Sequence, residues 1–151
     1  MGFSFMGTLI AITILVPNLL LIKFPPKNAP DNSKDIKIIF TILERIGQVA
    51  CIFLLIISKR NFNNLSMNVY ALLMSLCILI YYYLWIRYLI KDQNYRLLWE
   101  PLIFIPIPMA VFPVCAFAFA ALLGKSVWLG IAVIFLAIGH LVNSWNSYKS
   151  N

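Results

Sequence analysis

The chain has 151 residues, of which 62% are hydrophobic and only 11% are charged. A soluble domain is about half apolar and about one quarter charged, and a chain this apolar has too little polar surface to cover itself in water. The composition therefore excludes a disordered chain, a disulfide scaffold and a soluble nucleic-acid-binding domain. It predicts an integral membrane protein with no nucleic-acid partner.

Long stretches without charged side chains predict the membrane-spanning helices. Each reaches the ~20 residues that a helix needs to cross the hydrocarbon core, and they cover residues 1–22, 61–86, 101–124 and 126–148. A fifth apolar stretch carries Glu44 and Arg45 near its middle, between two strongly apolar runs that should bring it into the membrane. We therefore predict an all-α membrane helix bundle, a single domain over 1–151 without an extramembrane part, with five transmembrane helices at about 3–24, 36–58, 65–90, 101–123 and 126–146.

Basic residues in the connections predict the orientation of this bundle. With the N-terminus outside, the inner side holds Lys23, Lys27, Lys34, Lys37, Lys91, Arg96 and Lys149. The outer side then holds only Lys59, Arg60 and Lys125. The positive-inside rule favours this arrangement, N-terminus out and C-terminus in. The net charge of +7 would then meet anionic headgroups, so we expect a multi-pass protein of the cell membrane with membrane lipids as partners.

Polar side chains within the predicted helices gather in their inner halves. Asn18, Glu44 and His140 each lie three or four residues from the centre of their helix toward the predicted inside, or roughly 5–6 Å at 1.5 Å per residue. Because a polar group that faces lipid is costly, we expect Glu44, Arg87 and His140 to converge, with Asn18 and Gln48 close by. The predicted polar layer, a candidate ligand site, comprises Asn18, Glu44, Gln48, Arg87, Glu100, His140 and Asn143.

The spacing of these residues is that of helix faces. Glu44 and Gln48 are four residues apart, and His140 and Asn143 are three apart, so each pair lies on one face of its helix. A layer of this kind either ties helices together or lines a pocket that opens toward the cytoplasm. Both interpretations remain open at the level of the sequence.

The predicted fourth helix is rich in proline. Pro106, Pro108 and Pro113 each remove a backbone donor and should kink or locally unwind it. A broken helix beside a polar layer exposes carbonyl groups and is a common way to build a ligand site in a membrane. We expect this helix and its neighbour to supply the pocket wall, with Tyr83, Phe104, Ile105, Pro106 and Pro108.

Other motifs of known chemistry are missing from the sequence. Cys51, Cys77 and Cys115 lie within predicted spans and form no Cys-x-x-Cys pair, which disfavours a thiol oxidoreductase or a thiolate zinc site. His-Glu-x-x-His, Gly-x-Ser-x-Gly and glycine-rich phosphate loops do not occur. We expect no metal and no cofactor, and no catalytic residue is assigned.

Several stretches of the chain resemble a group of known sequences. They are residues 15–19, residues 43–48, and the proline-rich segment followed by Gly139 and His140. Together they resemble small multi-helix membrane proteins of Gram-positive bacteria over most of the chain. The resemblance implies a location in a bacterial plasma membrane and implies no particular activity. The translocator protein family shares the predicted number of helices alone.

Three functions remain open from the sequence. The first is a binding protein or membrane subunit that holds a small hydrophobic or amphipathic, lipid-like molecule in the cytoplasmic-side pocket. The second is a small intramembrane enzyme that uses Glu44 and His140 on a lipid substrate. The third is a structural or accessory subunit, with a protein partner, whose polar layer only specifies packing. A few polar groups among apolar walls are typical of ligand sites, which favours the first.

Overall fold

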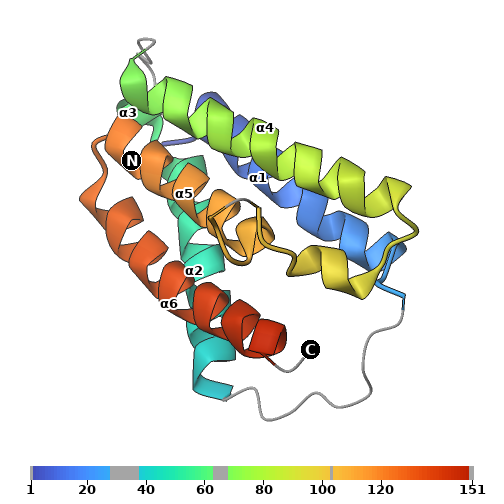
Figure 1. The fold of residues 1–151 in the computed structure, drawn as a ribbon. Helices are drawn as coiled ribbons and strands as arrows, with labels where there is room; N and C mark the ends of the chain where they lie inside the picture. The colour runs from blue at the N-terminus through green and yellow to red at the C-terminus, as the bar shows by residue number, and fades with distance from the viewer. Residues whose placement is uncertain (1, 28–37, 63–67, 103, 150–151) are drawn as a thin grey trace.

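The computed structural model describes residues 2–27, 38–62, 68–102 and 104–149 of the chain, and these form an all-helical fold (Figure 1). No strand occurs among these residues; only isolated bridges pair short stretches of backbone. The predicted fold class is thereby confirmed. In chain order the helices are α1 (Phe5–Lys23), α2 (Ile38–Ile57), α3 (Lys59–Phe62), α4 (Val69–Ile90), the 3-10 helix η1 (Tyr95–Leu98), α5 (Pro108–Leu123) and α6 (Val127–Lys149).

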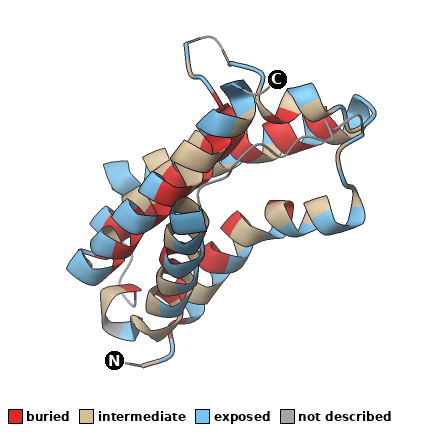
Figure 2. Ribbon diagram, turned by 90° about the horizontal axis from the view of Figure 1, so that it is seen from below, coloured by how far each residue is buried: buried red, intermediate tan, exposed pale blue. Residues whose placement is uncertain are grey.

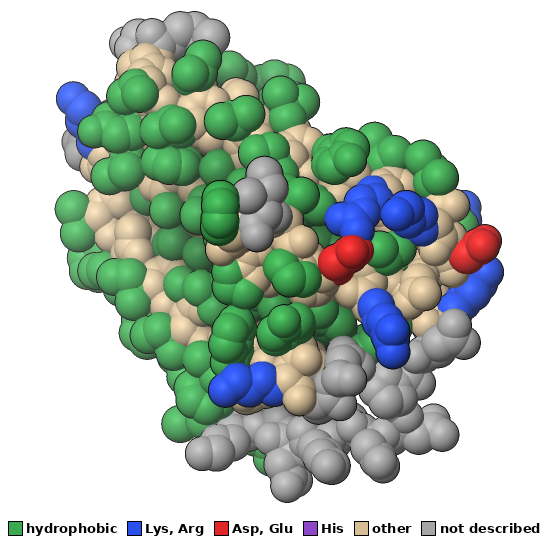
Figure 3. Space-filling view, viewed as in Figure 1, with side chains coloured by type: hydrophobic (Ala, Val, Ile, Leu, Met, Phe, Trp, Pro, Cys, Tyr) green, Lys and Arg blue, Asp and Glu red, His purple; other side chains and the backbone are tan. Residues whose placement is uncertain are grey.

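The helices have the lengths and the apolar surfaces of a membrane-embedded protein. By length and composition, α1, α2, α4 and α6 can each cross a bilayer. Large apolar side chains lie exposed on the outer surfaces of these helices. They cover much of the face seen in the space-filling view in Figure 3. The buried residues lie along the sides of the helices that face one another (Figure 2). Apolar surface of this extent is stable against lipid and would be unfavourable in water.

The predicted fourth span is wrong over its first turns. We expected a helix from residue 101, but α5 begins at Pro108 and has 16 residues, about 24 Å at 1.5 Å per residue. A residue that precedes proline avoids the α-helical region, and Ile107, between two prolines, adopts a left-handed φ of 47°. The preceding segment instead folds into a tight turn, in which Leu102 and Ile105 exchange backbone hydrogen bonds of 3.0 and 2.9 Å. The number of spans stays a prediction.

Glycines bring α2 and α6 into direct backbone contact. A Cβ added to Gly47 would lie 2.6 Å from the Cα of Leu136, and one added to Gly139 would lie 2.6 Å from the carbonyl oxygen of Phe40. Such distances are shorter than real Cβ contacts, so no larger residue fits without moving a helix. Small residues allow this close packing of helices within a membrane.

The connections tie the helix ends together at both ends of the bundle. At one end, the backbone N–H of Gly2 donates to Ile57 O at 2.9 Å, and the Asn61 side chain donates to Gly124 O at 2.7 Å. At the other end, Lys27 N–H donates to Gln93 O at 2.8 Å. The described connections therefore separate Lys27, Lys91 and Arg96 from Lys59 and Lys125, as the topology requires. Which end faces the cytoplasm stays a prediction.

Candidate functional site

A hydrogen-bonded cluster links α2 to α6 beside the glycine contacts. His140 Nδ1 lies 2.7 Å from Glu44 Oε1, and the Asn143 side-chain amide donates to Glu44 Oε2 at 2.6 Å. An ionised carboxylate only accepts hydrogen bonds, so its partnership with His140 requires the hydrogen on Nδ1. The three-residue spacing of His140 and Asn143 on α6 puts both side chains on the face that meets Glu44.

This cluster opens into a cavity of about 360 Å³ between α1, α2, α5 and α6. The side chains of Glu44 and His140 are 23% and 25% exposed, so neither is sealed in a dry core. The polar lining residues are Asn18, Glu44, Arg45, Gln48 and His140. The rest of the lining is apolar and comprises Leu15, Leu19, Leu21, Ile22, Pro113, Val114, Phe117 and Leu136.

Two side-chain amides at the cavity retain hydrogen-bonding capacity. Tyr81 of α4 donates its hydroxyl to Asn18 Oδ1 at 2.7 Å, which leaves the NH₂ group of Asn18 without an acceptor within the described part of the chain. The Gln48 amide likewise makes no side-chain hydrogen bond with any described residue. The cavity is therefore lined by groups that can bind a polar occupant.

A smaller cavity of about 90 Å³ adjoins the first and shares Asn18, Leu21 and His140 with it. It reaches Trp85 of α4 and Trp99 after η1. Both indole N–H groups are buried without a hydrogen-bond acceptor among the described residues, although Trp85 lies beside the Tyr81 hydroxyl.

Trp85 and Trp99 are not among the site residues predicted from the sequence. The available signal was the spacing of the aromatic side chains on α4. Tyr81, Trp85 and Tyr88 recur every three or four residues and so share one face of the helix. In the structure they are buried and stack edge to face, with ring centroids 6.4 and 5.4 Å apart.

Arg87 does not join Glu44 and His140, contrary to our expectation. It forms an ion pair with Glu100 near the end of α4, away from the α2–α6 contact. The reason is the helix arrangement, because α4 packs mainly on α5 whereas α2 packs mainly on α6. Of the predicted polar layer, the structure thus brings four residues to one cavity: Asn18, Glu44, Gln48 and His140. Asn143 does not line this cavity but is bonded to Glu44. Arg87 and Glu100 lie elsewhere. Ligand binding by any of them stays a prediction.

The predicted wall residues also lie elsewhere. Tyr83 is 59% exposed and Phe104 is 94% exposed, both on the outer surface. Pro106 is exposed in the turn before α5, and Pro108 is buried at the first position of α5 without lining the cavity. Because α5 begins late, its contribution to the wall comes from Pro113, Val114 and Phe117 instead.

The remaining reactive groups of the described residues include three free cysteines. Within the described ranges, no three His, Cys, Asp or Glu side chains gather as metal ligands would. Cys51 and Cys77 are buried free thiols, and Cys115 is a half-buried one. Comparison of the chain with known protein families, with curated proteins and with solved structures finds no match.

Proposed function

We propose that this membrane protein binds a small amphipathic molecule in the cavity between α1, α2, α5 and α6. The observation that carries the proposal is the partial exposure of the Glu44–His140 pair to a 360 Å³ cavity whose other walls are largely apolar. Ligand sites are typically 300–1,000 Å³ in volume and combine apolar walls with a few convergent polar groups.

The unmet hydrogen-bonding groups favour binding over a purely structural layer. A network that only held helices together would satisfy its own donors and acceptors, because an unpaired buried polar group costs about 1–3 kcal/mol. Asn18 and Gln48 are half-buried, and at the cavity they present amide groups that have no partner among the described residues. An occupant with hydrogen-bond donors and acceptors would pair with these amide groups.

The lining also suggests the chemistry of the occupant. A polar group of the occupant would contact Glu44, Gln48 and His140. Its apolar body would contact Leu15, Leu19 and the other apolar residues. At about 30 Å³ per water, the cavity has the room of about 12 waters, which suits a small molecule.

A second candidate function is intramembrane acid–base catalysis by the same pair. The 2.7 Å contact between Glu44 and His140 favours it, because a carboxylate that orients an imidazole is a common arrangement for a general base. No Ser or Cys lines the described cavity wall, so any nucleophile would come from the substrate or from water. Catalysis would therefore begin with removal of a proton from one of these.

The experiment is the recovery of small molecules from full-length protein extracted with its native lipids, followed by mass spectrometry. Gln48→Phe fills the cavity from α2. Val49→Phe makes the same change on the adjacent residue, which is 66% exposed on the outer face, and is the matched control. We expect a molecule that copurifies with the wild type and with Val49→Phe and is at least fivefold depleted in Gln48→Phe, the effect of about 1 kcal/mol.

Equal recovery from both variants, or no recovery from folded wild-type protein, would overturn the binding proposal. The enzymatic candidate has its own criterion. It requires the recovered molecule to be chemically converted on incubation with the wild type and to remain unchanged with His140→Ala.

A further inference from the structure

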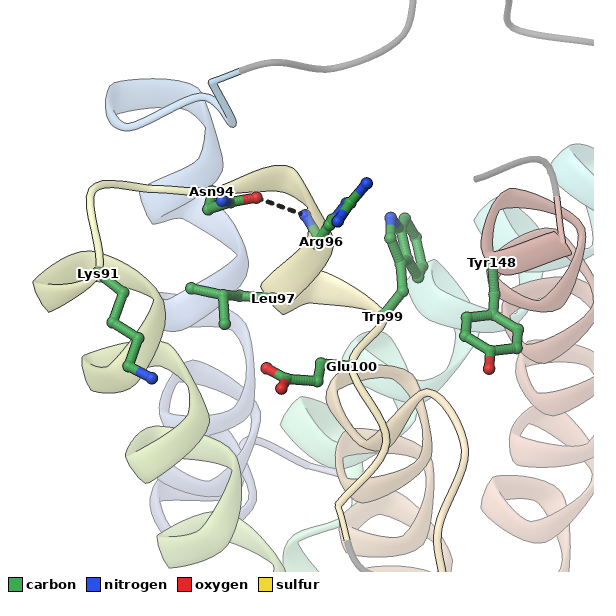
Figure 4. A pocket seen from close by; sticks show the side chains of 7 residues that line it. All are labelled: Lys91, Asn94, Arg96, Leu97, Trp99, Glu100 and Tyr148. Carbon is green, nitrogen blue, oxygen red and sulfur yellow. Dashed lines mark hydrogen bonds between the residues drawn. The ribbon is translucent and has the colours of Figure 1, made fainter.

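We infer a second binding site, for a phosphate group, in a groove at the end of the bundle where α4 and α6 end. The groove has a volume of about 630 Å³, is open on one side, and is lined by Lys91, Asn94, Arg96, Leu97, Trp99, Glu100 and Tyr148 (Figure 4). It is distinct from the intramembrane cavity, shares no lining residue with it, and does not depend on the proposed function.

The charge balance of this groove is positive. Glu100 is the one acidic residue among the described residues of its lining, and its carboxylate is already paired with Arg87. Lys91 and Arg96 form no ion pair within the described part of the chain, and neither does the neighbouring Asp92. Two exposed cations therefore face an open groove whose acidic side chain is neutralised, and Figure 3 shows Lys and Arg side chains gathered at this end.

The backbone arranges further groups beside these cations. Trp99 directly follows η1, and its backbone N–H donates to Arg96 O at 3.0 Å, which keeps these two residues close together. Figure 4 shows Arg96 and Trp99 along the groove between Lys91 and Tyr148. The ring of Trp99 lines the groove, whereas its indole N–H is buried and has no acceptor among the described residues.

This combination fits a phosphate oxyanion attached to an apolar body. A guanidinium and an ammonium are the side chains that most often bind phosphate. The indole and phenol rings of Trp99 and Tyr148 provide apolar surface of the kind found at the membrane interface. Basic pockets beside the ends of transmembrane helices on the cytoplasmic side bind anionic lipid headgroups. The positive-inside rule predicts that this end of the bundle faces the cytoplasm.

The test measures lipid retention by full-length protein in detergent, titrated with phosphatidylglycerol or phosphatidylcholine and observed by native mass spectrometry. The variant is Lys91→Gln with Arg96→Gln. Each cation near a membrane surface contributes about a fivefold preference for an anionic lipid. We expect the double variant to bind phosphatidylglycerol about 25-fold more weakly. Binding of phosphatidylcholine should be unchanged, because its own choline balances the charge of its phosphate.

The matched control removes the same charge from the opposite end of the bundle, with Lys59→Gln and Lys125→Gln, and should retain the wild-type preference. Equal loss in both double variants, or no loss in either, would overturn the site, provided that circular dichroism shows folded protein. Inorganic phosphate and glycerol phosphate distinguish the sources. If they displace the lipid at millimolar concentration, the groove takes free phosphates too; if only anionic lipid competes, it is a site for an anionic lipid headgroup.

Discussion

Gly139 on α6 faces the backbone of Glu44 on α2 so closely that a Cβ added to the glycine would lie 2.7 Å from the Cα of Glu44. The next residue along α6 is His140, whose ring reaches the carboxylate of the same Glu44. Close backbone approach and polar contact are thus parts of one arrangement. The glycine sets the helix separation at which the imidazole and the carboxylate can form a hydrogen bond.

The first prediction concerns this separation. Gly139→Ala should force α2 and α6 apart and destabilise the protein by about 1–3 kcal/mol, the usual cost of overpacking. Thermal unfolding in detergent measures the effect. Gly130→Ala is the control on the same helix, because nothing lies within 4 Å of a Cβ at this position. It should be neutral or slightly stabilising, since alanine favours helix more than glycine; equal losses in the two variants would contradict the prediction.

The second prediction concerns the hydrogen bonds to Glu44. Asn143 donates to one carboxylate oxygen and His140 contacts the other, so replacing Glu44 by Leu leaves both partners unpaired. In a double-mutant cycle of Glu44→Leu with Asn143→Leu, we expect a coupling free energy of about 0.6–2 kcal/mol, the range measured for hydrogen bonds between membrane helices. Reversible unfolding in mixed micelles provides the four stabilities. Additive effects would show that the contact contributes nothing to folding.

Periodicity and composition predicted much of this arrangement. Charge-free runs located α1, α4 and α6 to within a few residues, because a spanning segment carries few charged side chains over most of its length. The i, i+3 and i, i+4 spacings correctly put Glu44 with Gln48, and His140 with Asn143, on shared faces. These are properties of one helix at a time, which a sequence expresses directly.

The sequence did not predict which helices pack together or where the backbone departs from the α-helical conformation. The partner of Arg87 depends on which helices pack together, and depth along a helix does not determine that. The late start of α5 follows from Ile107, whose conformation is constrained by a proline on each side. We had treated the prolines as kinks within a helix, which is true only of Pro113.

The third prediction uses the separation of Arg87 from the cavity. Its ion pair with Glu100 is partly exposed, with 48% of the Glu100 side chain accessible, and such pairs contribute about 0–1 kcal/mol. Arg87→Gln should therefore lower stability by less than about 1 kcal/mol. It should also leave recovery of the cavity-bound molecule unchanged, whereas Glu44→Gln should reduce it. Mass spectrometry after extraction compares the two variants, and depletion by Arg87→Gln alone would place Arg87 in the site after all.

The last prediction is the orientation, on which the side of both proposed sites depends. In a background where Cys51, Cys77 and Cys115 are replaced by Ala, Lys27→Cys and Lys125→Cys place single thiols at opposite, exposed ends of the bundle. The loop charges predict that a membrane-impermeant thiol reagent labels the thiol at position 125 in intact cells and the one at position 27 only after the cells are opened. The reverse labelling pattern would show that the protein has the opposite orientation in the membrane. The Glu44–His140 cavity would then lie in the outer half of the membrane, and the groove at Lys91 and Arg96 would face the outside, where anionic headgroups are no longer the expected partner.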